Sequence, residues 1–164
     1  MINFYLGSIS NLGPDRNQEF FDSLTDDTFA HGIHKAKRDL VNNGNKVFQY
    51  LLSYEGEHSF SELYGIPPVG VCHGDDVQYL FSPNFISRDP LSDNDALVKE
   101  LMTDLWTNFA KFGDPTPPGS KFSWIPVDPE SEYYEFFEIS GPETSGMVKS
   151  EELGKRMKLW DSIY

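Results

Sequence analysis

Apolar residues recur at helical spacing along the second half of the chain, starting from about Ser92. This single stripe is typical of one face of an amphipathic helix, and it consists of Leu97, Val98, Leu101, Met102, Leu105, Trp106, Phe109 and Ala110. Ser92 precedes the stripe as an N-cap residue, and Gly113 follows it as a C-cap. The pattern therefore predicts a long helix, and we expect Trp106 and Phe109 to lie in the core.

Two further segments also have helical character. The first is predicted to begin with Thr25 or Asp26 as its N-cap and to end at Asn43-Gly44, after an irregular segment over about residues 1–24. Its apolar positions are Phe29, Ile33, Ala36, Leu40 and Val41. The other is predicted as a last helix over about residues 150–164.

Two short apolar segments are typical of strands. Residues 47–54 are apolar on both faces, as expected of a buried parallel strand, and residues 133–139 alternate in part. The alternation of helices and strands predicts an α/β fold. Because two strands do not make a sheet that can cover itself, we expect the missing strands to come from more chain or from a partner.

Charge and composition exclude several classes of function. The chain has 164 residues and a formal net charge of −13, so it has no basic surface for nucleic acid. It contains no apolar run of the roughly 18 residues needed for a membrane helix. Its first residues do not resemble a secretory signal, which leaves its location unknown. The one cysteine, Cys72, excludes an internal disulfide and is expected to be a small buried apolar residue rather than a nucleophile.

His73 is the candidate catalytic residue. It lies in the run Gly70-Val71-Cys72-His73-Gly74-Asp75-Asp76-Val77-Gln78-Tyr79-Leu80-Phe81, beside a glycine that permits a sharp turn. A histidine on a loop can serve as the base of a serine esterase if a serine and an acid lie within reach. The two acids that follow it are expected to cap the next helix or to bond loop amides. By spacing alone, a loop histidine is also an ordinary surface residue.

The run at residues 70–81 resembles the histidine signature of the type-B carboxylesterases, the family of cholinesterases and juvenile hormone esterases. Residues 105–117 resemble the family's helix end, and Trp124-Ile125-Pro126 follows in the family's order. The resemblance covers nearly the whole chain. It implies that residues 1–164 are the C-terminal part of a type-B carboxylesterase domain. The implied fold is the C-terminal third of an α/β-hydrolase, with an incomplete sheet and flanking helices.

The resemblance implies that His73 is the catalytic base of a serine esterase that acts on small-molecule carboxylic esters without a cofactor. No Gly-x-Ser-x-Gly sequence occurs among the 164 residues, and the family's acid is also unmatched. We therefore expect the isolated chain to be an inactive fragment of an esterase. Two alternatives remain open: a non-catalytic relative that functions in binding or adhesion, and an inactive truncated remnant.

Three other polar residues have competing interpretations. Asp26 either caps a helix or, by the resemblance, supports the histidine loop from behind. His31 and His34 lie three residues apart and either occupy a partly exposed helix face or bind a metal, with Asp27 or His58 as a third ligand. The surface interpretation is favoured, so no metal is expected.

Overall fold

The computed structural model describes residues 2–7, 17–67, 70–81, 91–131 and 133–164. The longest helix, α5 (Asp93–Phe112), forms where the stripe and its two caps predict it. The hydroxyl of Ser92 accepts a hydrogen bond from the Asp95 amide at 3.1 Å. Gly113 ends the helix in the left-handed region with φ of 67°, a conformation that glycine adopts without strain.

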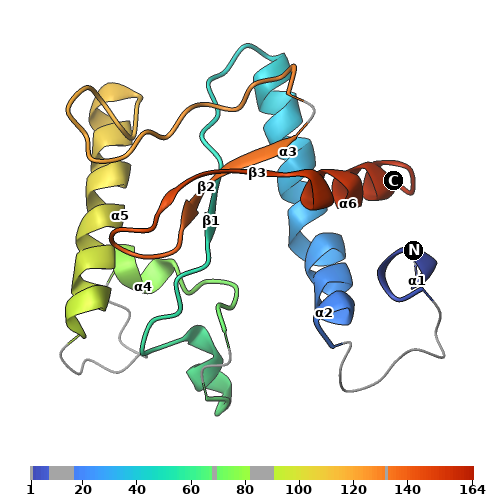
Figure 1. Ribbon diagram of the computed structural model, residues 1–164, viewed down its shortest axis with the longest axis horizontal. Coiled ribbons are helices and arrows are strands. Elements are labelled where there is room, and N and C mark those ends of the chain that lie inside the picture. The colour runs from blue at the N-terminus through green and yellow to red at the C-terminus, as the bar shows by residue number, and fades with distance from the viewer. Residues whose placement is uncertain (1, 8–16, 68–69, 82–90, 132) are drawn as a thin grey trace. The chain divides into compact units, whose positions relative to one another are not determined.

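The described helices and strands are α1 (Ile2–Tyr5), α2 (Asn17–Thr25), η3 (Asp26–Ala30), α3 (His31–Asn42), β1 (Tyr50–Leu52), η4 (Phe60–Tyr64), α4 (Val77–Leu80), α5 (Asp93–Phe112), β2 (Tyr134–Ile139), β3 (Gly146–Ser150) and α6 (Glu151–Asp161) (Figure 1). They belong to two compact units. One unit comprises Met1–Val47, Pro126–Glu135 and Lys149–Tyr164, and the other comprises Phe48–Ile125 and Phe136–Val148.

The strands form a sheet in the order β1-β2-β3. The predicted parallel pairing is confirmed, with Tyr50 opposite Phe137 and Leu52 opposite Ile139. β1 is shorter than the predicted strand over residues 47–54, and Leu51 on one face is exposed. The sequence interpretation missed β3, a five-residue strand that contains glycine and lysine, which are depleted in strands.

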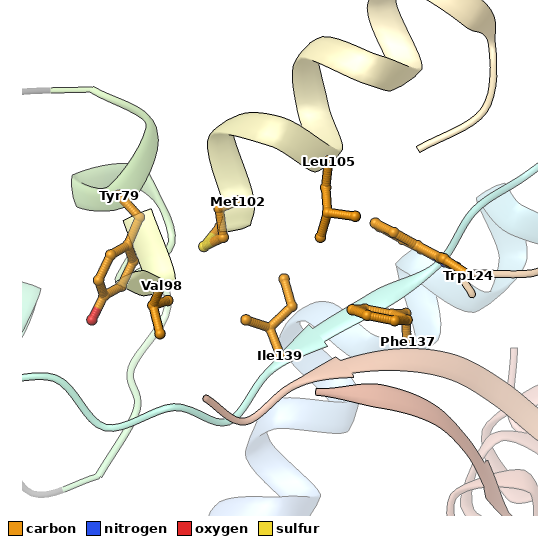
Figure 2. Close-up of a cluster of buried hydrophobic side chains, with 7 residues drawn as sticks. All are labelled: Tyr79, Val98, Met102, Leu105, Trp124, Phe137 and Ile139. Carbon is orange, nitrogen blue, oxygen red and sulfur yellow. The ribbon is translucent and has the colours of Figure 1, made fainter. Parts of the chain in front are cut away.

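The core of the second unit lies between α5 and β2. Figure 2 shows Val98, Met102 and Leu105 projecting from α5 toward Phe137 and Ile139. Trp124 stacks on Phe137 with a ring-centroid distance of 5.0 Å. Trp106 packs against this cluster as predicted, whereas Phe109 is exposed, so its predicted core position is wrong. Among the described residues, only part of the apolar stripe of α5 is therefore buried.

The helical segment in the first unit begins earlier than predicted. α2 starts at Asn17 and continues through the π-helical turn η3 into α3, so part of the segment predicted to be irregular is helical. Thr25 has helical dihedral angles (φ −62°, ψ −42°) and makes no side-chain capping bond. Asp26 lies inside the helical run, which shows that the prediction of an N-cap at Thr25 or Asp26 is wrong.

The predicted apolar face of this helix is not the face that packs. Phe29, Ile33 and Leu40 are exposed, whereas His31 and Lys37 are buried. The ammonium group of Lys37 lies 3.7 Å from the centroid of the Tyr134 ring, an arrangement in which the ring stabilises the cation. The polar face of α3 therefore makes the contacts inside this unit.

Candidate active site

His73 lies at an exposed corner of a tight turn formed by residues 72–75. The amide of Asp75 donates to the carbonyl of Cys72 at 3.2 Å, which closes a four-residue turn. Gly74 has φ of +93°, and no residue other than glycine has positive φ among the described residues. A negative φ at the second turn position followed by a positive φ at the third is typical of a type II turn. The turn therefore presents His73 at its second position, directly before α4.

Asp75 is the most heavily bonded side chain of this turn, and only 5% of its surface is exposed. One carboxylate oxygen accepts from the amide of Phe60 at 2.7 Å, and the other accepts from the amide of Cys72 at 2.8 Å. The hydroxyl of Ser59 lies 3.0 and 3.1 Å from the two oxygens. The carboxylate thus joins the histidine turn to the residues that begin η4.

η4 begins with a capping box that the sequence interpretation did not identify. The Ser59 hydroxyl accepts from the amide of Ser61 at 3.2 Å, and the Glu62 carboxylate accepts from the amide of Ser59 at 3.0 Å. Reciprocal bonding of this kind satisfies two amides that a helix start leaves without partners. The spacing of serine and glutamate, three residues apart, is the sequence signal from which it could have been found.

Asp76 attaches the same loop to the sheet. Its carboxylate accepts a hydrogen bond of 2.6 Å from the hydroxyl of Tyr50 on β1. Burial, and then the bond to Asp76, raise the pKa of Tyr50 well above its usual range, so the phenol remains a donor. The Tyr50 ring packs edge-on against Trp106 at a centroid distance of 4.9 Å. Asp75 therefore bonds loop amides, as one of the sequence expectations stated, whereas the bond of Asp76 to a strand side chain was not predicted.

Cys72 does not have the apolar surroundings predicted for it. Its thiol is half-buried and lies 3.3 Å from the Ser59 hydroxyl and 3.3 Å from a carboxylate oxygen of Asp75. The side chain belongs to the polar cluster around Asp75. The prediction of a small apolar core residue is therefore wrong, because the turn directs the thiol toward this carboxylate.

Asp26 is fully buried in the other unit, where its carboxylate bonds Arg156 and Tyr5. The Arg156 guanidinium donates to both carboxylate oxygens at 2.7 Å, and the Tyr5 hydroxyl donates at 2.5 Å. Burial, and then the bond to Asp26, raise the pKa of Tyr5 to about 12. Asp26 thus joins α1, η3 and α6 within its unit. Its supporting role behind the histidine loop stays a prediction.

His31 and His34 share one acidic partner, Asp161. Their Nε2 atoms lie 3.1 and 3.5 Å from the two carboxylate oxygens, and Arg38 donates to the same carboxylate at 2.6 Å. His31 is buried, so the predicted partly exposed face is wrong for it. Asp161 lies 130 residues from His31 in the sequence, which is why sequence spacing did not identify it.

No group of three or more metal-ligating side chains that could hold an ion occurs among the described residues. Asp27, one of the two third ligands considered for a metal, instead accepts a hydrogen bond from the Tyr164 hydroxyl at 2.9 Å. His58, the other, lies 3.2 Å from the Glu62 carboxylate. None of the described helices has both the length and the apolar character needed to cross a membrane.

Comparison with known proteins identifies the family. The model of the Carboxylesterase family matches residues 1–160. The chain belongs to the carboxylesterase family. Juvenile hormone esterase of Tribolium castaneum is 32% identical over 127 residues, which are 71% of this chain and 22% of that protein. Bile salt-activated lipase of Rattus norvegicus is 31% identical over 117 residues, which are 70% of this chain and 18% of the lipase.

Solved carboxylesterase structures confirm the α/β-hydrolase fold. The crystal structure of juvenile hormone esterase from Manduca sexta, with OTFP covalently attached, superposes with a TM-score of 0.76 at 25% identity. That match covers 99% of this chain and 31% of the esterase. A carboxylesterase from Geobacillus stearothermophilus superposes with a TM-score of 0.69 at 18% identity and supports the fold alone.

The carboxylesterase chain described here spans about a fifth of the length of the two curated relatives and about a third of the solved structures. The resemblance inferred from the histidine run is thus confirmed at the level of family and fold. The predicted role of His73 and the assignment of residues 1–164 as the C-terminal part of one domain remain predictions.

Proposed function

We propose that this chain is the C-terminal part of a serine carboxylesterase domain and that His73 is the catalytic base of that domain. The observation that carries the proposal is the turn at residues 72–75. His73 lies exposed at the corner of this turn. The carboxylates of Asp75 and Asp76 fix the turn through hydrogen bonds to loop amides and to Tyr50. Family membership over residues 1–160 supports an esterase-type parent protein.

In the proposed reaction, the nucleophilic serine and the triad acid are supplied by residues outside this chain. The imidazole of His73 takes the proton from the serine hydroxyl as the serine oxygen attacks the ester carbonyl carbon. The bond from that carbon to the alkoxy oxygen then breaks, and His73 gives the proton to the departing alcohol. A water molecule next gives a proton to His73 and attacks the acyl carbon. The serine leaves with that proton, and the carboxylic acid is released.

The substrate class we propose is a small-molecule carboxylic ester. The names of the relatives describe esters or lipids as the molecules on which those proteins act. The net charge of −13 supports a small-molecule substrate over a nucleic acid, because a polyanion would be repelled. No cofactor is needed for this reaction, because the serine, the histidine and water supply every proton and bond.

The test uses the longest polypeptide that is naturally translated with this chain in it, purified as wild type and as His73→Ala. His58→Ala is the matched control, because His58 lies on a neighbouring loop and bonds Glu62 at 3.2 Å. We expect the wild type to hydrolyse a p-nitrophenyl ester and to react covalently with a fluorophosphonate. His73→Ala should lower kcat/KM by at least about 1,000-fold, whereas His58→Ala should leave it within about threefold.

Two results would contradict the proposal. His73→Ala that keeps activity within about tenfold of the wild type would show that His73 is not the base. A folded wild-type protein that neither hydrolyses the ester nor reacts with the fluorophosphonate would favour the non-catalytic binding protein or the inactive remnant.

A further inference from the structure

We propose that Asp75 is a positioning residue for His73, which rests on the proposed role of His73 as the base. Asp75 lies two residues after His73, and it acts through the main chain of the turn. Three features of the turn support this role: the hydrogen bonds that close it, the segment to which it is attached, and the need for a carboxylate at position 75.

The turn is closed on both sides by the same residue. The amide of Asp75 donates to the carbonyl of Cys72 at 3.2 Å, and the carboxylate of Asp75 accepts from the amide of Cys72 at 2.8 Å. His73 and Gly74 are therefore the two central residues of a ring in which both ends are held by hydrogen bonds. A central residue of such a ring has little freedom in its own backbone angles, so the direction of the Cα–Cβ bond of His73 is restricted.

The carboxylate also attaches the ring to a second segment of the chain. Its other oxygen accepts from the amide of Phe60 at 2.7 Å, and the Ser59 hydroxyl lies 3.0 and 3.1 Å from the two oxygens. Ser59 is itself fixed by its capping box with Glu62. The Phe60 ring lies against Gly74, with its nearest atom 3.5 Å from the position of an added Cβ. The corner that carries His73 is therefore held against the start of η4.

A carboxylate satisfies both attachments, because each of its oxygens can accept a hydrogen bond. Each of the two oxygens faces a main-chain amide, one from Phe60 and one from Cys72. An asparagine at this position would turn its amino group toward one of these amides in either orientation, and two donors cannot bond each other. Asp75→Asn thus preserves the size of the side chain and opens one of the two attachments.

For catalysis, the attachments of Asp75 determine where the His73 imidazole lies. A general base must lie within hydrogen-bond distance of the serine proton, and a displacement of about 1 Å can cost about 100-fold in rate. Loss of either attachment allows the His73 corner to move relative to the rest of the site. We therefore expect kcat to fall, while KM, which depends on substrate contacts elsewhere, stays nearly constant.

The experiment compares Asp75→Asn with Asp104→Asn in the longest polypeptide that is naturally translated with this chain in it. Asp104 lies exposed on α5, so its variant makes the same charge change away from the turn. Active sites are counted by complete reaction with a fluorophosphonate, and kcat is calculated per reacted site. We expect Asp75→Asn to lower kcat per site about 100-fold with KM within about twofold, and Asp104→Asn to change neither.

A merely structural role predicts a different outcome and would overturn the inference. In that case Asp75→Asn would reduce the number of reactive sites, while each remaining site turned over at the wild-type rate. If Asp75→Asn does not fold, Ser59→Ala decides. It removes the hydroxyl that bonds the Asp75 carboxylate and also accepts from the Ser61 amide, while both main-chain amides that bond Asp75 remain. We expect Ser59→Ala to lower kcat per site about three- to tenfold. An unchanged value would refute the role of Asp75, and an inactive wild-type protein would refute the proposed function itself.

Discussion

Replacing Arg156 with methionine should destabilise the unit that contains α1, η3 and α6 more than most single substitutions in this chain. The guanidinium group bonds both carboxylate oxygens of Asp26 at 2.7 Å and lies 3.1 Å from Asp22. Asp26 is 0% exposed, so its carboxylate cannot regain water when the guanidinium is removed. Methionine fills much of the same space, and the effect is therefore that of an unpaired buried charge.

The expected loss is about 3–5 kcal/mol of unfolding free energy, the typical cost of removing one partner from a buried ion pair. The Tyr5 hydroxyl still donates to Asp26 at 2.5 Å, which favours the lower part of this range. Domains of this size are stable by about 5–15 kcal/mol in total, so the loss is a large fraction of the stability. Adding Asp26→Asn to Arg156→Met should restore at least about 2 kcal/mol, because the unpaired charge is then gone.

The assay is urea unfolding followed by tryptophan fluorescence, since Trp160 donates to the Tyr5 hydroxyl at 2.8 Å and reports on this cluster. Lys155→Met is the control. Lys155 lies beside Arg156 on α6 and pairs with Glu151 at 2.7 Å, but both side chains are exposed, so we expect little measurable change. A loss below about 1 kcal/mol for Arg156→Met, or additive effects of the two substitutions, would refute the reasoning.

Four further predictions concern other parts of the chain. Gly56→Ala should lower stability by about 1–3 kcal/mol in denaturant unfolding, because its Cβ would lie within 3 Å of the Tyr79 hydroxyl and an Asp95 oxygen. Gly32→Ala, on α3 with nothing within 4 Å, should raise stability by about 0.5–1 kcal/mol. Burial, and then the charge of Lys37, lower the pKa of His34. As pH falls, the imidazole of His34 is therefore protonated in the unfolded state before it is protonated in the folded state. Stability should then fall as pH drops below about 6.5, the pKa of an unperturbed histidine. His34→Gln should remove that part of the pH dependence. The isolated chain should show no hydrolysis of a p-nitrophenyl ester, and turnover that is lost on His73→Ala would contradict this.

Features determined by neighbouring residues could be predicted from the sequence. The helix from Ser92 to Gly113 carries its stripe and both caps within its own sequence, and its ends were predicted within one residue. The turn at His73 followed from Gly74, because its φ of +93° is one that glycine adopts without strain. The histidine run also indicated the family, which the match over residues 1–160 confirms.

Features determined by distant partners could not be predicted. Asp26 resembled a helix cap because its true partner, Arg156, lies 130 residues away. Asp161, which fixes His31 and His34, is equally remote. The spacing of Phe29 and Ile33 indicated a helix, but the contacts inside this unit use the polar side chains of α3. Periodicity indicates which residues share a face, but it does not indicate what covers that face.

The most direct test of the central claim is the sequence of the native transcript, extended in the 5′ direction from the histidine run. The claim that this chain carries the base of a serine carboxylesterase predicts an upstream in-frame Gly-x-Ser-x-Gly followed by an acid, because the order in this fold is serine, acid, histidine. An upstream sequence in which that serine is replaced would contradict the claim, as would a transcript whose reading frame begins at Met1.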